Sequence, residues 1–143
     1  LVILRVPGIY AADRLPLERL RAGFPVLRRE DDVYTNHIHA DDLAAIVARA
    51  LEEAAPSGVY NACDDTQMLL GDWLDLVADH AGLARPARVA RREIDALVPS
   101  AVASFMRESR RLDNRRLKTL LGVRLLYPTV HEGLEHEHAF GTH

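Results

Sequence analysis

Residues 1–10 read LVILRVPGIY, and this stretch decides the fold more than any other. Leu1–Val6 is apolar except for Arg5, and Pro7-Gly8 then stops the run. A short, continuous apolar run predicts a strand that is covered on both faces, as in a parallel sheet. In open α/β sheets ligands bind beyond the carboxyl ends of the strands, so the turn after Val6 is a candidate ligand loop.

The rest of the chain alternates between short strands and helices. "FPVLRREDDVYTNHIH" (24–39) predicts two strand-like pieces around an acidic turn, and "GVYNACDD" (58–65) predicts another buried strand. Apolar spacing and capping residues predict helices over 15–22, 40–54, 70–81, 94–106, 114–121 and 129–138. We expect an α/β fold over 1–143, in one domain, with a few-stranded, mostly parallel sheet, a small hairpin and several helices.

Composition excludes several classes of partner. The net charge of −3 gives no reason to expect nucleic acid, and no apolar stretch approaches the roughly 20 residues that span a bilayer. A single cysteine, Cys63, excludes an internal disulfide framework and a cysteine-based zinc site. We therefore expect a soluble, cytoplasmic protein with neither a nucleic-acid nor a membrane partner.

The residues that hydride transfer needs are missing from these 143 residues. The eight glycines never reach G-x-G-x-x-G spacing, so no glycine-rich turn is present to cradle a dinucleotide's phosphates. No tyrosine is followed four residues later by lysine. We therefore assign no catalytic residue and leave open whether the chain is an enzyme.

Four segments together resemble a known family. They are "LRVPGIY" (4–10), "HIHADDLA" (37–44), "GVYNACDD" (58–65) and "SRRLDNRRLKTLLGVRLLYPTVHEGL" (109–134). In this order and spacing they are similar to the C-terminal half of extended short-chain dehydrogenase/reductases, the NAD-dependent epimerase/dehydratase family, and especially to nucleoside-diphosphate-sugar epimerase-like proteins. The resemblance implies a Rossmann-type fold, with NAD or NADP bound by the full-length protein and a sugar-like substrate.

The resemblance also implies site residues. The backbone of Pro7, Gly8 and Ile9 would line the carboxamide side of the nicotinamide. Tyr10, Arg14, His37 and His39 would line the substrate side. Many members have arginine in the hairpin strand, where this chain has Thr35 and His37. We expect a truncated protein that shapes the substrate side of the cleft, binds no cofactor alone and is inactive alone.

Two other functions stay open at this point. The chain could be a stand-alone, non-catalytic binding or oligomerisation module. It could also be a metal-dependent hydrolase, because His37 and His39 alternate along a strand and Asp41 and Asp42 follow. We assign no metal ligand, because the histidines suit a strand end and the aspartates suit a helix start.

An exposed strand edge makes self-association an expectation. A parallel strand separated from its neighbours leaves an unpaired edge and apolar faces, which favour pairing with another chain. We predict a homo-oligomer whose interface covers residues 1–6 and the inward face of the 40–54 helix.

Overall fold

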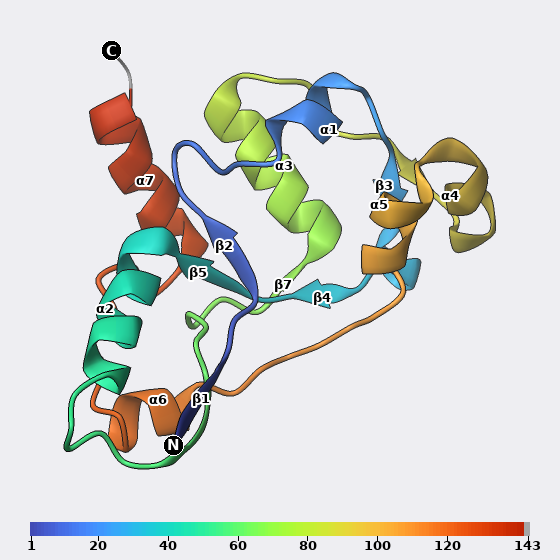
Figure 1. Cartoon of the computed structure of the whole chain (residues 1–143). Coiled ribbons are helices and arrows are strands. Elements are labelled where there is room, and N and C mark those ends of the chain that lie inside the picture. The colour runs from blue at the N-terminus through green and yellow to red at the C-terminus, as the bar shows by residue number, and fades with distance from the viewer. Residues whose placement is uncertain (142–143) are drawn as a thin grey trace. The chain divides into compact units, whose positions relative to one another are not determined.

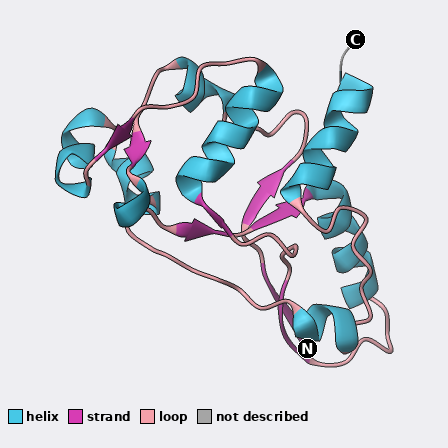
Figure 2. Cartoon of the chain, turned by 180° about the vertical axis from the view of Figure 1, so that it is seen from behind, coloured by secondary structure: helices cyan, strands magenta, loops and turns pink. Residues whose placement is uncertain are grey.

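The computed structural model describes residues 1–141, with side chains up to His136, and confirms the α/β fold class (Figures 1 and 2). The chain separates into two compact units, each assembled from distant stretches of sequence. Unit 1 contains Leu1–Arg14, Asn36–Thr66 and the described residues from Leu112 onward, and unit 2 contains Leu15–Thr35 and Gln67–Arg111. The single domain that length suggests stays a prediction, because a compact unit need not fold independently.

Unit 1 holds two short parallel strand pairs and three helices. β1 (Val2–Arg5) pairs with β6 (Gly58–Asn61), and β2 (Gly8–Tyr10) pairs with β5 (His37–His39). The helices are α2 (Ala40–Ala50), α6 (Arg115–Thr119) and α7 (Val130–Gly141). Both pairs join strands from far apart in the sequence, as parallel pairing requires.

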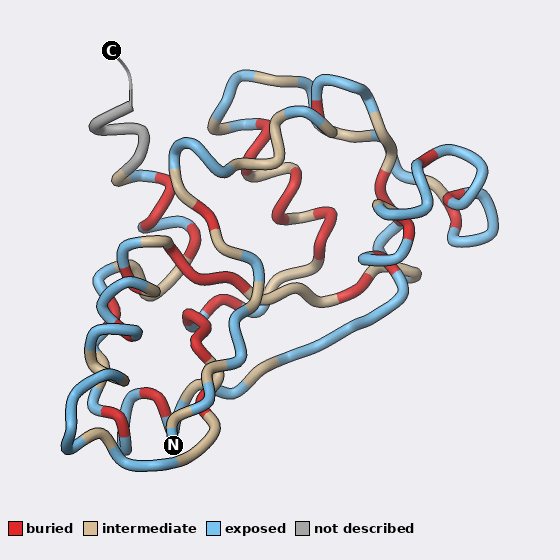
Figure 3. The backbone as a smooth tube through the Cα atoms, viewed as in Figure 1, coloured by how far each residue is buried: buried red, intermediate tan, exposed pale blue. Residues whose placement is uncertain are grey.

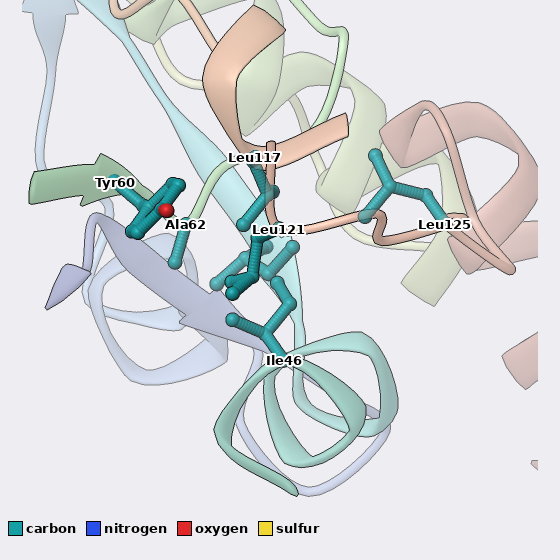
Figure 4. Close-up of a cluster of buried hydrophobic side chains, with 7 residues drawn as sticks. Ile46, Tyr60, Ala62, Leu117, Leu121 and Leu125 are labelled. Atoms are coloured by element: carbon teal, nitrogen blue, oxygen red, sulfur yellow. The ribbon is translucent and has the colours of Figure 1, made fainter. Parts of the chain in front are cut away.

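The core of unit 1 lies on the inner face of the β1–β6 pair. Ile46 of α2, Leu117 of α6 and Leu121 meet Tyr60 and Ala62 there (Figure 4). All five side chains are fully buried, and Val2 and Leu4 of β1 pack against them from the strand. Long-range packing of apolar side chains therefore connects the first residues of the chain to its last third.

The outer face of β1 differs from the sequence prediction. A continuous apolar run predicts burial on both faces, but burial alternates along β1, and Ile3 on the outer face is 47% exposed. An apolar run does not by itself show whether one face of a strand is covered or both. Here only Val2 and Leu4, on the inner face, pack against the core. β1 pairs with no strand other than β6 in the part of the chain that the structure describes.

The start of α2 is capped differently from the sequence prediction. The N-cap is His39, whose Nδ1 accepts a hydrogen bond from the backbone N–H of Asp41 at 3.0 Å. Asp42 is buried and turns away from the helix terminus: its two carboxylate oxygens accept the backbone N–H groups of Leu126 and Tyr127 at 2.8 and 3.0 Å. Asp42 therefore fixes the chain that leads into α7.

The apolar face of α2 is largely used inside unit 1. Ile46 is fully buried and Leu43 packs against the same core, so the inward face predicted as an oligomer interface is already covered there. From the predicted face, Val47 and Leu51 are exposed.

Unit 2 is built around α3 (Leu70–Ala81), whose bounds match the sequence prediction. Gly82 ends it in the left-handed conformation, at φ 69°, which explains the glycine. The other elements are α1 (Leu17–Arg21), β3 (Val26–Leu27), a 3₁₀ turn η1 (Arg29–Asp31), β4 (Tyr34–Thr35), β7 (Met68–Leu69), β8 (Arg88–Val89), α4 (Arg91–Leu97) and α5 (Ser100–Phe105).

The predicted hairpin over residues 24–39 does not form. β3 pairs in parallel with β8, β4 pairs antiparallel with β7, and β5 pairs with β2, so no strand of this segment pairs with its neighbour in sequence. Local alternation predicts short strands but not their partners. The basic stretch around β8 is neutralised by α3, because Arg88 pairs with Asp75 at 2.7 Å and Arg85 pairs with Asp79 at 2.6 Å.

Replacing Asp42 should destabilise unit 1. Asp42→Ala leaves the backbone N–H groups of Leu126 and Tyr127 without their acceptors. We expect the free energy of unfolding to fall by about 2–4 kcal/mol, measured by urea unfolding followed by circular dichroism. The matched control Asp41→Ala removes an exposed carboxylate from the same turn and should cost about 0.5 kcal/mol or less. Equal costs for the two variants would contradict the assignment.

Candidate functional site

The predicted cofactor and substrate residues meet at the β2–β5 pair. The parallel register places Gly8 beside His37, Ile9 beside Ile38 and Tyr10 beside His39 (Figure 1). β5 is buried along its whole length (Figure 3). The structure therefore brings the residues predicted to contact the cofactor next to those predicted to contact the substrate, although α1, β3 and β4 lie between β2 and β5 in the sequence.

Tyr10 is an internal residue of this site and is 1% exposed. Its ring meets the His39 ring edge-on, with the centroids 5.2 Å apart, and its hydroxyl donates to the carbonyl oxygen of Thr129 at 3.5 Å. Gly133 of α7 leaves room for this hydroxyl, because a Cβ at that position would overlap it. Tyr10 thus ties the end of β2 to the start of α7.

The two histidines of β5 have different surroundings. His37 is buried, and burial lowers its pKa to about 4, so the ring is neutral at pH 7. The Nδ1 atom of His39 accepts a hydrogen bond from the backbone N–H of Asp41. The His39 ring also lies against Tyr127, with centroids 4.4 Å apart. His39 therefore caps a helix and packs in an aromatic cluster.

Arg14 is the member of the predicted set that lies at the surface. It ends a turn in which its backbone N–H donates to the carbonyl oxygen of Ala11 at 3.0 Å, and its side chain is exposed. Gly8 is also exposed, and its N–H donates to the carbonyl oxygen of Asn36 at 3.3 Å. Gly8 and Arg14 are therefore exposed members of the predicted set, whereas Tyr10, His37 and His39 are buried.

Asp64 is a member of this region that sequence reasoning did not select. The Asp64-Asp65 pair predicts an ordinary turn after a strand, but Asp64 is 3% exposed, and its backbone N–H donates to the carbonyl oxygen of His37 at 2.8 Å. Its Oδ1 accepts the N–H of Thr66 at 2.8 Å, while Oδ2 is buried without a hydrogen-bond partner. Burial raises the pKa of Asp64 to about 7, so this carboxyl exchanges a proton near neutral pH.

Two other chemistries lack support in this geometry. Cys63 is buried, and burial, with the nearby Asp64 and Asp65 carboxylates, raises its pKa to about 11, so it does not act as a thiolate nucleophile. Among the described side chains, which end at His136, no three His, Cys, Asp or Glu residues come together to hold a metal ion. Within residues 1–141, no helix has the length and apolar character needed to span a bilayer.

The buried Asp64 should make stability depend on pH. Its folded-state pKa lies above the ordinary value of 3.8, so its contribution to stability is complete below pH 3.8 and is lost as the pH rises to about 7. Relative to Asp64→Asn, the wild type should lose up to about 4 kcal/mol between pH 4 and 8, measured by urea unfolding. The neighbouring Asp65, whose pKa is lowered because hydrogen bonds from Lys118 and Asn114 outweigh burial, supplies the control Asp65→Asn. A parallel pH profile for wild type and Asp64→Asn would contradict this assignment.

Solved structures of known proteins share this fold. No family model matches the chain, and no curated protein matches it by sequence. A functionally unknown conserved protein from Silicibacter pomeroyi is 32% identical with a TM-score of 0.80, and the match covers 97% of this chain and 49% of that protein. The human epimerase family protein SDR39U1, solved with NADPH, is 19% identical with a TM-score of 0.74, over 94% of this chain and 47% of its own.

The match extends to named epimerases. A Methylobacillus flagellatus protein provisionally described as an NAD-dependent epimerase/dehydratase is 29% identical with a TM-score of 0.66, over 99% of this chain and 48% of its own. A UDP-glucose 4-epimerase from Thermotoga maritima, solved with UDP-glucose, also shares the fold. The chain spans about half the length of each protein that it matches. With its four sequence motifs and this fold, the chain resembles about half of a protein of the NAD-dependent epimerase/dehydratase family.

Proposed function

We propose that the chain forms the substrate-binding half of an NAD(P)-dependent nucleotide-sugar epimerase, dehydratase or reductase and has no redox turnover by itself. The β2–β5 pair carries this proposal, because in its register Gly8 lies beside His37 and Tyr10 lies beside His39. The match to about half the length of solved relatives supports the proposal that the nucleotide is bound by residues outside this sequence.

The cofactor would meet this chain only at Pro7 and at the first residues of β2. Gly8 is exposed and has no side chain, so a flat nicotinamide ring could approach the backbone of Pro7, Gly8 and Ile9 closely. A bound NAD or NADP would supply hydride transfer. The sequence contains no glycine-rich turn for the pyrophosphate, so most of the cofactor's binding energy would come from the other half.

The substrate would meet Arg14 first. Arg14 is the exposed cation of the proposed set and suits an anionic group of a sugar nucleotide. Tyr10, His37 and His39 are buried and would shape the wall of the site. His37 is neutral at pH 7, so it would contribute a polar contact rather than a charge.

A stand-alone binding or oligomerisation module is the second candidate. Two features of β1 favour it: the exposed apolar side chain of Ile3, and the lack of a second partner strand among the described residues. An unpaired strand edge readily accepts another chain. On either proposal the isolated chain would form homo-oligomers through the Leu1–Val6 segment. We also infer a cytoplasmic location, which is supported by Cys63, a free buried thiol.

Titration with NADPH tests whether this chain binds the cofactor by itself. We expect no saturable enhancement of NADPH fluorescence by the chain, because the phosphates have no backbone cradle among its residues. The human relative that was solved with NADPH is the positive control. Stoichiometric NADPH binding, or turnover of the cofactor, would overturn the proposal.

Loss of Arg14 tests the substrate side. We expect weak binding of the probe UDP-glucose, and Arg14→Ala should weaken it by roughly tenfold, since a charge-assisted contact to the diphosphate is removed. Arg124→Ala, which removes another exposed arginine of unit 1, is the matched control and should have no effect. Nuclear magnetic resonance titration measures both variants, and equal affinities for the two would contradict the role of Arg14.

A further inference from the structure

The segment that leads into α7, residues 126–130, is held by hydrogen bonds to distant parts of unit 1. The residues that hold it are Asp42, Asp65, Thr66 and Tyr10. Beyond this segment α7 packs against β5 (Figure 1), and its Gly133 lies against the ring of Tyr10. The position of α7 beside the buried residues of the candidate site therefore depends on these hydrogen bonds.

Thr66 connects the first turn of α7 to Asp64. The Oγ1 atom of Thr66 accepts a hydrogen bond from the backbone N–H of Val130, where α7 begins, at 3.0 Å. The backbone N–H of Thr66 donates to Oδ1 of Asp64 at 2.8 Å, and the Thr66 side chain is hydrogen-bonded to the same carboxyl group. Thr66 is buried as well, so Asp64 and α7 are joined through one buried hydroxyl.

The buried surroundings of Asp64 suit a neutral carboxyl group. Asp64 is 3% exposed, and its Oδ2 has no hydrogen-bond partner among the residues that the structure describes. Burial raises the pKa of Asp64 to about 7, and the negative charges of Asp65 and Asp42 add to this effect. A charged carboxylate at this position lacks solvation, so it favours an arrangement in which the turn that carries it opens to water.

Asp64 lies among several other titratable or charged groups. On its own turn and on the neighbouring elements these are Asp42 of α2, His37 of β5, Cys63 and Asp65 of the turn, Lys118 of α6, and the exposed His131 and Glu132 of α7. Lys118 forms its ion pair with Asp65. The effect of His37 has the opposite sign to that of Asp64, because burial lowers the pKa of His37 to about 4 and acid would favour any opening that exposes it. Acid stabilisation of the closed arrangement near pH 5–7 would therefore come from Asp64.

We propose that Asp64 and Thr66 form a pH-sensitive switch: protonated Asp64 holds the first turn of α7 closed beside Tyr10, and loss of its proton releases that turn. In the released arrangement the turn that carries Asp64 moves out to water, and Val130 loses Thr66 as its acceptor. The carboxyl group then has its ordinary pKa of 3.8, so release increases as the pH rises from about 4 to about 7. Release would uncover the Tyr10 ring, which Gly133 covers in the closed arrangement. The switch depends on contacts inside unit 1 and not on the proposed function.

Amide hydrogen exchange at Val130, followed by nuclear magnetic resonance, tests the switch. This N–H donates to Thr66, so it exchanges only when the first turn of α7 opens. Asp64→Asn keeps a neutral group of the same shape at this position. Relative to Asp64→Asn, the wild-type protection factor of Val130, corrected for the intrinsic exchange rate, should fall roughly tenfold per pH unit between about pH 5 and pH 7. The same pH dependence in the wild type and in Asp64→Asn would overturn the proposal.

Two controls separate release of α7 from global unfolding and from local effects at Asp64. The amide of Ile46, a buried residue of α2, should stay at least roughly tenfold more protected than that of Val130 in the wild type at about pH 7, because the opening is local. This comparison needs no variant, and equal protection of the two amides would refute the switch. Thr66→Val removes the hydroxyl that joins Asp64 to α7, so Val130 should exchange as fast near pH 5 as near pH 7. Wild-type protection of Val130 near pH 5 in Thr66→Val would also count against the switch.

Discussion

The parallel pairing of β1 with β6 is the constraint on which unit 1 depends. It joins Val2–Arg5 to Gly58–Asn61, and it turns the side chains of Val2, Leu4 and Tyr60 toward one core. α2 and α6 supply Ile46 and Leu117 to cover that face. Because only one face is covered, the same pairing leaves Ile3 and the outer edge of β1 open. The core and the exposed face of β1 are thus two sides of one strand pair.

Polar side chains at the carboxyl ends of the strands hold the C-terminal part of the chain in place. Asp42 binds the backbone before α7, Thr66 accepts the N–H of Val130 at 3.0 Å, and Tyr10 reaches the carbonyl oxygen of Thr129. Buried polar groups need partners, and here the partners are backbone groups of one segment. The region proposed to bind ligands is therefore also the region that fixes α7, so substitutions there are expected to affect stability.

Several features of the fold and the site could be read from local sequence. The helix Leu70–Ala81 was predicted with its bounds, because apolar spacing and Gly82 define both its face and its end. β1 and β6 were predicted as strands from continuous apolar runs that end in turn residues. The family motifs selected Gly8, Tyr10, His37 and His39, and the structure places these residues on two adjacent strands. The family resemblance also gave the correct fold.

What the sequence by itself determined is the identity of most elements, because helix and strand periodicity are local properties. Only the tertiary structure decided the partners. It paired β3 with β8 and β4 with β7 in place of a hairpin, and it made His39 the cap of α2 in place of an aspartate. It also showed that Asp64 is a buried carboxyl with an altered pKa. Strand pairing, side-chain burial and pKa shifts all depend on contacts with residues far away in the sequence, and a local sequence pattern does not show which residues make those contacts.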